Sequence, residues 1–246
     1  MSERLVVVHP TPQILAQAVA VRLLTEILDR QSVSSPVHVA LTGGTVGIAT
    51  LAEAAKSSLV EAIDWSNVHL WWGDERFLPQ GDKDRNEVQA RDAWLDSLDG
   101  LPEENIHFMP RAVDGYTVEQ AAADYAQELK AHASEEADVP HFAVVLLGMG
   151  PDAHIASLFP HHADAEQNDA PAIPVRNSPK PPPLRVSLTF DAIQSADEVW
   201  VIAAGAEKAP AVAQGLAGAP RSEAPVSAAQ GRSRTLWLLD AAAATV

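Results

Sequence analysis

Asp152 and His154 lie two residues apart in a turn that follows a long apolar run of this chain. A carboxylate beside an imidazole is a pairing that can move protons near neutral pH. The run from Phe142 to Gly148 carries no charge and predicts a strand buried on both faces, as in a parallel sheet. The turn would then lie at the carboxyl edge of the sheet, where α/β proteins bind ligands. A structural alternative stays open, in which Asp152 caps a helix that starts near Ala153 and His154 is a surface residue.

The same turn also fits a dinucleotide-binding fingerprint, because Gly148, Gly150 and Ala153 have the G-x-G-x-x-A spacing. Its context contradicts that interpretation. Asp152 would place a carboxylate where a pyrophosphate has to meet the helix N-terminus, and the region about 20 residues further on is rich in proline instead of forming a second strand. We therefore expect no nicotinamide or flavin, and no other cofactor.

A second glycine loop, from Leu41 to Thr45, leaves one predicted strand and enters a helix. The adjacent Gly43 and Gly44 would let backbone N–H groups converge on an anion at the helix N-terminus, and Thr42 and Thr45 could add hydroxyl donors. The loop lacks the lysine of a P-loop, so a nucleoside triphosphate is not indicated. It predicts a phosphate site, and the open alternative is a plain turn with Thr45 as the N-cap.

Three charged residues in succession, Asp74, Glu75 and Arg76, follow another apolar run. Their charges must be solvated, neutralised by ion pairs or engaged with a ligand. The guanidinium of Arg76 is a planar fork that suits a carboxylate or a phosphate. Ion pairs among the three are the alternative. Downstream, Asn86 precedes a helical segment, where it could serve only as an N-cap.

Arg185 and Lys208 complete the set of candidates. Lys208 lies about one helical turn past the apolar run from Val199 to Ala203, a location from which its ammonium could meet a phosphate at the same edge of the sheet. Few cations exist in this acidic chain, so each one beside a loop carries more information.

Histidines elsewhere favour packing over metal binding. His38 and His69 fall within predicted strands, whereas His161 and His162 lie in a predicted solvated loop. The acid and the imidazole of the first turn could form a metal site with one member of that pair. No dense ligand motif is present, however, and we expect no metal.

The composition limits the compartment and the partners. The 246 residues, 47% of them apolar, suffice for one large α/β domain, and we expect a single domain over residues 1–246. Neither a long apolar run nor a signal-peptide pattern is present, so the expected location is cytoplasmic. The absence of cysteine excludes disulfides and cysteine nucleophiles. A net charge of −16 disfavours nucleic acid and anionic membranes as partners.

Strand-like and helix-like segments alternate along the chain, which predicts a doubly wound, mostly parallel sheet with helices on both faces. The predicted strands are Leu5–Val8, Val37–Leu41, Val68–Trp72, Ile106–Met109, Phe142–Leu147, Leu184–Thr189, Val199–Ala203 and Thr235–Leu239. The predicted helices are Pro12–Asp29, Gly47–Leu59, Asn86–Ser97, Val118–His132, Ile155–Leu158 and Glu207–Leu216. Two segments, His161–Ala170 and the proline-rich Ser178–Pro183 around Lys180, read as surface loops.

Over nearly its whole length the chain resembles the 6-phosphogluconolactonase family, which shares its NagB/RpiA-like, Rossmann-like fold with glucosamine-6-phosphate deaminase. The motifs that carry the resemblance are the loop Leu41–Thr45, WGDERFLP at Trp72–Pro79, LGMGPDAHIASLFP at Leu147–Pro160, RVSLTF at Arg185–Phe190 and GAEK at Gly205–Lys208. Two departures stand out. The family usually has Asp-Gly-His-Thr where this chain has Ala153 and Ile155, and Ser-Thr-Pro where it has Thr45-Val46-Gly47.

The resemblance implies hydrolysis of 6-phospho-D-glucono-1,5-lactone to 6-phospho-D-gluconate in the oxidative pentose phosphate pathway, by a monomer or a homodimer. It implies His154 as general base, oriented by Asp152. Arg76 is a candidate for contacts with the oxyanion or the sugar, and Asp74 is a candidate for contacts with sugar hydroxyls or for orienting the water. The phosphate-binding residues would be Thr42, Gly43, Gly44, Thr45, Arg185 and Lys208.

Two alternatives remain at this point. One is a deaminase or isomerase of amino-sugar phosphates, which is disfavoured because that family carries an acid in a Phe-Asn-Glu-Pro stretch where this chain has Ser157–Pro160. The other is a sugar-phosphate sensor without turnover. Such regulators carry a DNA-reading helix-turn-helix, and this chain has no basic N-terminal module.

Overall fold

A parallel sheet forms the centre of the molecule. The computed structural model describes residues 3–245, and within them six strands pair in the order β1-β9-β8-β5-β2-β3, with every neighbouring pair parallel. The strands are β1 Glu3–His9, β2 Val37–Leu41, β3 Val68–Trp72, β5 Phe142–Gly148, β8 Glu198–Ala203 and β9 Arg234–Asp240. The apolar run around Phe142 is therefore a central strand, as its lack of charge predicts.

The strand order reverses beside β2. The chain steps outward from β2 to β3 and then returns to the opposite side of β2 as β5, so the connections diverge between β2 and β5. In open α/β sheets, ligands bind outside the carboxyl ends of the strands at such a reversal. The loops that contain the two glycine turns both start at this point.

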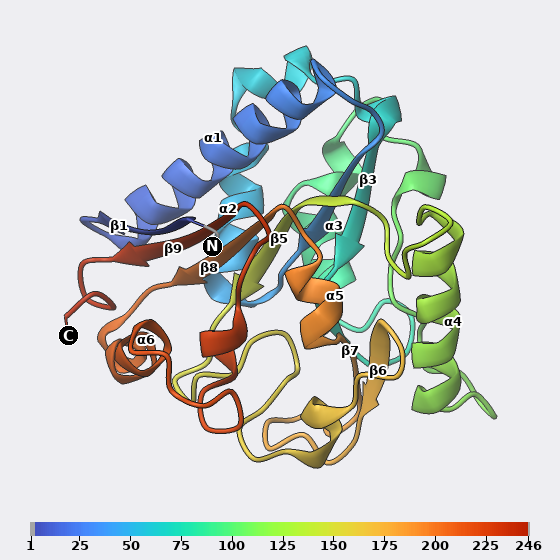
Figure 1. The fold of residues 1–246 in the computed structure, drawn as a ribbon. Coiled ribbons are helices and arrows are strands. Elements are labelled where there is room, and N and C mark those ends of the chain that lie inside the picture. Colours follow the sequence, from blue (N-terminus) through green and yellow to red (C-terminus); the bar gives the residue numbers. More distant parts are fainter. Residues whose placement is uncertain (1–2, 246) are drawn as a thin grey trace.

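Helices cover both faces of the sheet, which confirms the doubly wound prediction (Figure 1). One face carries α1 Pro12–Gln31, α2 Gly44–Ala54 and α3 Asn86–Ala93; the other carries α4 Val118–Ala131, α5 Phe190–Gln194 and α6 Ala209–Leu216. Alternate strand residues face the two layers, so Leu70 belongs to the apolar cluster that includes α1 and α2, while Trp71 contacts Tyr125 of α4. Trp71, Trp200 and Trp237 are all buried in these layers.

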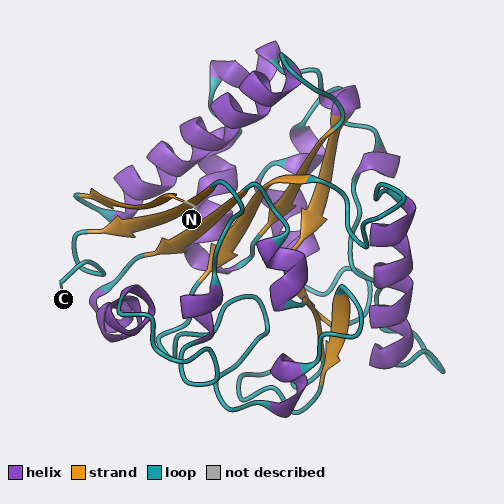
Figure 2. Ribbon diagram, viewed as in Figure 1, coloured by secondary structure: helices purple, strands orange, loops and turns teal. Residues whose placement is uncertain are grey.

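A small antiparallel sheet of β4 Asp74–Arg76, β7 Arg185–Leu188 and β6 Ala172–Val175 lies beyond the carboxyl edge of the main sheet (Figure 2). The predicted strand Leu184–Thr189 exists as β7, but it belongs to this second sheet. The N–H of Leu188 donates to the carbonyl of Gly73 at 2.9 Å, which attaches the small sheet to the end of β3. β4 and β6 were not predicted, because strands of three and four residues give little periodic signal.

Two predicted elements are wrong. Residues 106–109 form no strand: Ile106 makes a single bridge to Leu70, and Pro110, which has no N–H, follows at once. Residues 155–158 form no helix, because Ile155 bridges to Met149 and Leu158, and Ala156 adopts a left-handed φ of 47° that a helix does not accept. Because no helix begins there, the alternative in which Asp152 caps a helix is also wrong.

Two predicted helices differ from the observed ones by three residues or more at an end. Helix α2 runs over Gly44–Ala54 instead of the predicted Gly47–Leu59. The helix predicted over Asn86–Ser97 ends at Ala93, because Trp94 leaves helical geometry with a φ of −158°. Asn86 lies inside this helix and is not its N-cap, which is Arg85.

None of the helices within residues 3–245 combines the length and the apolar character needed to cross a bilayer. The cytoplasmic location, the single domain over residues 1–246 and the oligomeric state stay predictions.

Candidate active site

The loops that follow β2, β5 and β8 surround a cavity of about 480 Å³ at the carboxyl edge of the main sheet. These three strands are neighbours, so loops that are far apart in sequence meet in space. Every predicted site residue except Asp152 lines the cavity: Thr42, Gly43, Gly44, Thr45, Asp74, Arg76, His154, Arg185 and Lys208. Asp152 lies behind His154 and contacts it directly.

His154 and Asp152 form a hydrogen-bonded pair. Nδ1 of His154 lies 2.6 Å from Oδ1 of Asp152, and the imidazole packs against the ring of Phe159 with 4.6 Å between centroids. A carboxylate only accepts, so Nδ1 carries the proton and Nε2 keeps its lone pair. Nε2 has no hydrogen-bond partner among residues 3–245. The pair thus presents an oriented, unoccupied base at the cavity.

The geometry of the turn depends on Gly150. A Cβ built on this residue would lie 2.0 Å from His154 Nδ1 and 2.3 Å from Asp152 Oδ1, so only glycine leaves room for the pair. Ala153 adopts the left-handed φ of 65° that the usual glycine would take there. The departure from glycine therefore keeps the conformation, at a cost of roughly 1–2 kcal/mol in backbone strain.

Lys180 is a site residue that sequence reasoning missed. Its Nζ lies 3.0 Å from Asp152 Oδ1 and 3.1 Å from His154 Nδ1, and it lines the cavity. Burial alone would raise the pKa of Asp152, but hydrogen bonds from His154 and Lys180 outweigh burial and hold that pKa well below its usual value. The carboxylate of Asp152 is therefore ionised and accepts hydrogen bonds from both donors. The sequence feature that could have identified Lys180 is its position among four prolines in an acidic chain.

Arg185 holds the loop that carries Lys180. Its guanidinium donates to the carbonyls of Lys180, Pro181 and Pro182 at 3.0 to 3.3 Å, and its Nη1 lies 3.8 Å from Asp74 Oδ2. It also lines the cavity, so it borders the predicted phosphate site, but most of its donors are directed at the loop. This arrangement fixes the position of the Lys180 ammonium.

The glycine loop after β2 opens helix α2 directly onto the cavity. Gly43 is the N-cap, and Gly44 has a φ of 79°, so a helix start without side chains faces the site. Thr45 lies inside the first turn, and its predicted alternative role as N-cap is wrong. Thr42 accepts a hydrogen bond from the N–H of Gly148 at 3.0 Å through Oγ1, which ties the loop to the end of β5. The first N–H groups of a helix are free to bind an anion.

Lys208 adds a cation to the same cavity. It belongs to the short 3₁₀ helix Ala206–Lys208, which follows Gly205 at a φ of 102°. Burial lowers the pKa of the Lys208 ammonium; Glu207 opposes this change, and the positive charge of Lys180 adds to it. Two lysines that repel each other beside a helix N-terminus favour a bound anion that neutralises both.

No salt bridge joins the side chains of Asp74, Glu75 and Arg76 to one another within residues 3–245, so the alternative of an ion-pair cluster among the three is wrong. Asp74 Oδ2 accepts from Ser157 Oγ at 2.6 Å and faces the cavity. Arg76 donates to the carbonyl of Asp84, and its buried Nε has no partner within residues 3–245. The guanidinium therefore has donor capacity left for a ligand.

Glu75 has a structural role instead. It accepts hydrogen bonds from the N–H groups of Arg76, Asn86 and Glu87 at 2.7 to 2.9 Å and lies 3.7 Å from Arg85. Burial, its largest influence, raises the pKa of this carboxyl. Glu75 thereby fixes the start of α3 beside the cavity, where Asn86 donates to the carbonyl of Asp74.

The metal site considered for Asp152 and His154 does not form with the neighbouring histidines. Nδ1 of His162 lies 4.0 Å from Asp164, and His161 is exposed. Within residues 3–245, neither joins Asp152 and His154 in a group of metal-ligating atoms.

Comparison with known proteins gives one consistent picture. The pattern of the family described as glucosamine-6-phosphate isomerases/6-phosphogluconolactonase matches residues 10–237. The chain is 51% identical to a 6-phosphogluconolactonase of Streptomyces coelicolor over 243 residues, covering 97% of this chain and 93% of the relative. It is similar to the solved 6-phosphogluconolactonase of Trypanosoma brucei at 26% identity, with a TM-score of 0.85 and coverage of 99% and 98%. A monomeric glucosamine-6-phosphate deaminase shares the fold at 18% identity, with a TM-score of 0.78 and coverage of 100% and 99%.

Proposed function

The chain belongs to the glucosamine-6-phosphate isomerase/6-phosphogluconolactonase family, and we propose that it hydrolyses 6-phospho-D-glucono-1,5-lactone to 6-phospho-D-gluconate with a water activated by His154. The enzyme class, a 6-phosphogluconolactonase of the pentose phosphate pathway, comes from its curated relatives. The observation that carries the proposed mechanism is a single cavity that joins an oriented imidazole to a helix N-terminus and two lysines.

In the proposed reaction, the lone pair on His154 Nε2 takes a proton from water while the water oxygen attacks the lactone carbonyl carbon. A tetrahedral oxyanion results, and Asp152 balances the positive charge that develops on the imidazole. The bond from that carbon to the ring oxygen then breaks, and the proton passes from Nε2 to the departing oxygen. Arg76 and the N–H groups of the glycine turns are the candidate donors to the oxyanion.

We assign the phosphate of the substrate to the start of α2. Gly43, Gly44 and Thr45 would donate N–H groups, Thr42 and Thr45 hydroxyls, and Lys208 its ammonium. Arg185 borders this group. Asp74 would accept from sugar hydroxyls, since it is an acid of the cavity already fixed by Ser157.

Lys180 would serve as a positioning residue. By sharing Asp152 with the imidazole, its ammonium keeps the carboxylate ionised and at a fixed place. A firmly placed acceptor keeps the proton of His154 on Nδ1, which leaves Nε2 as the base.

The deaminase alternative remains less favoured on sequence grounds, because Ser157–Pro160 supplies no carboxylate at the place of the deaminase acid. A direct test is proton release from freshly generated 6-phosphogluconolactone, corrected for spontaneous opening, beside ammonium release from glucosamine 6-phosphate. We expect catalysis in the first assay and none in the second. Ammonium release at a comparable rate would overturn the proposal.

A further inference from the structure

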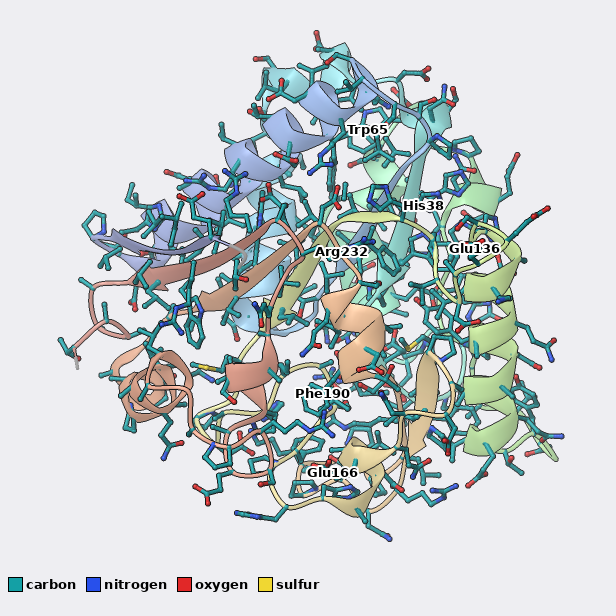
Figure 3. The ribbon with its side chains drawn as sticks, in the orientation of Figure 1. His38, Trp65, Glu136, Glu166, Phe190 and Arg232 are labelled. Atoms are coloured by element: carbon teal, nitrogen blue, oxygen red, sulfur yellow. The ribbon has the colours of Figure 1, made fainter. Side chains whose placement is uncertain are left out.

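A cluster of histidines lies toward the amino ends of β2 and β3, whereas the candidate active site lies at the carboxyl edge of the main sheet. His69 is near the amino end of the edge strand β3, His107 follows the 3₁₀ helix Glu103–Asn105, and His132 caps the C-terminus of α4. His69 is the second residue of β3, so three further residues, roughly 10 Å at strand spacing, separate it from the strand end at Trp72. His38 stacks against His69 on the same face, beside the end of α4 that leads to Glu136 (Figure 3).

The three rings bring their nitrogens close together. His69 Nδ1 lies 2.8 Å from His107 Nε2, and one ligand atom from each of His69, His107 and His132 lies within 4.8 Å of the others. Nitrogens bound tetrahedrally to Zn²⁺ at about 2.0–2.1 Å stand roughly 3.3 Å apart. The distance between any two of these nitrogens therefore differs from that spacing by at most about 1.5 Å. Rotation of the histidine side chains can supply a change of this size.

Hydrogen-bond acceptors on Glu128 orient two of the three rings, those of His107 and His132. His107 Nδ1 lies 2.8 Å from Glu128 Oε1, and His132 Nδ1 lies 3.1 Å from the carbonyl of Glu128. Both acceptors require the proton on Nδ1, so Nε2 of each ring keeps a lone pair. A histidine that donates its other N–H to a carboxylate or a carbonyl is the usual arrangement in metal sites.

The cluster is largely shielded from solvent, because His107 is buried and His69 and His132 are half-buried. His132 is partly exposed, which gives an ion a route from solvent.

We propose that His69, His107 and His132 bind a divalent transition-metal cation of the zinc class, with water as the fourth ligand. Three neutral imidazoles suit Zn²⁺, Ni²⁺ or Co²⁺ better than Mg²⁺ or Ca²⁺, which prefer oxygen ligands. The chain has no cysteine that could draw such an ion into a thiolate site.

The bound ion would join three separate segments. It would link the edge strand β3, the chain around His107 and the end of α4. The other contacts of α4 with the sheet include buried apolar side chains and the hydrogen bonds between the Tyr125 hydroxyl and the backbone of Trp72. The site would therefore stabilise the fold without a part in hydrolysis. At a hundredfold excess of the ion over its dissociation constant, we expect the Tm to rise by roughly 5–10 °C.

The test uses the full chain freed of metal with a chelator and titrated with Zn²⁺ by calorimetry. We expect one equivalent to bind, with at least a tenfold loss of affinity in His132→Gln and a 10- to 100-fold loss in Glu128→Gln, which removes only an outer partner. The matched control is His141→Gln, since His141 is exposed and bonds to Asp197 outside the cluster. Lactone hydrolysis should be unchanged in His132→Gln.

The variant His154→Gln distinguishes zinc binding at the three histidines from zinc binding in the cavity, where the imidazole and Asp152 could also attract an ion. Loss of Zn²⁺ binding in His154→Gln with full binding in His132→Gln would overturn the proposal, as would no binding by the wild-type chain. If His132→Gln fails to fold, anomalous scattering at the zinc edge from wild-type crystals shows where the zinc binds. A peak between the three rings supports the site, and a peak only elsewhere rejects it.

Discussion

Replacing Gly150 by alanine probes how tightly the turn after β5 positions the base. The added Cβ would lie 2.0 Å from His154 Nδ1, 2.1 Å from His154 Cε1 and 2.3 Å from Asp152 Oδ1. Contacts below 3.0 Å do not persist for real Cβ atoms, so the imidazole has to move by at least about 1 Å. A misplacement of 1 Å at a reacting group costs on the order of a hundredfold in rate. We expect kcat to fall by about that factor.

The assay is steady-state proton release from fresh lactone, with the Tm measured in parallel. The matched control is Gly73→Ala, because a Cβ at Gly73 would meet nothing closer than 3.8 Å although the residue follows β3 at the same edge of the sheet. Gly73→Ala should keep kcat within about twofold, and the Tm should change little in either variant. A Gly150→Ala enzyme with wild-type kcat would refute the reasoning that this glycine makes room for the catalytic pair.

Other changes at the cavity have separate expected signatures. Asp152→Asn leaves the shape of the pair but removes the anion that orients the imidazole, and kcat should fall by about 10²-fold or more; kcat within twofold of wild type would contradict the assigned tautomer. Lys180→Met keeps the aliphatic stem and should lower kcat by roughly tenfold with little change in KM, since it acts through Asp152; a rise in KM alone would instead make it a substrate ligand. Lys208→Ala should raise KM by about 10- to 100-fold with kcat nearly kept, because a charge-assisted contact to phosphate contributes about 1.5–3 kcal/mol. The pKa of Lys208 lies below that of a free lysine, so the ammonium is lost as the pH rises through that lowered value. The wild-type KM should rise at alkaline pH before the free-lysine pKa of about 10.4 is reached, and the KM of Lys208→Ala should not follow it.

Much of the site was predictable because parallel strands end at one edge. Loops that follow the buried runs ending at Leu41, Gly148 and Ala203 had to meet there, whatever the details of the turns. The charge-free run before Gly148 identified a central strand correctly. The positions of His154, Lys208 and the paired glycines follow from that topology alone.

What escaped prediction depends on long-range pairing or on single dihedral angles. Lys180 reaches the site only because β6 and β7 pair antiparallel and Arg185 holds the intervening loop, and neither relation has a local signal. The apolar Ile155–Leu158 suggested a helix, because the left-handed φ of Ala156 is not encoded in hydrophobicity. The close approach of the His69 and His132 rings likewise arises from the packing of α4 on the sheet.

The central claim is that His154 acts as the base within a cavity that holds the phosphate independently. Single-turnover hydrolysis of fresh 6-phosphogluconolactone by His154→Gln, with product affinity measured on the same sample, tests it most directly. We predict a loss of about 10²- to 10⁴-fold in the chemical step with binding of 6-phosphogluconate within a few-fold of wild type. An unchanged chemical step in a folded His154→Gln enzyme would contradict the mechanism.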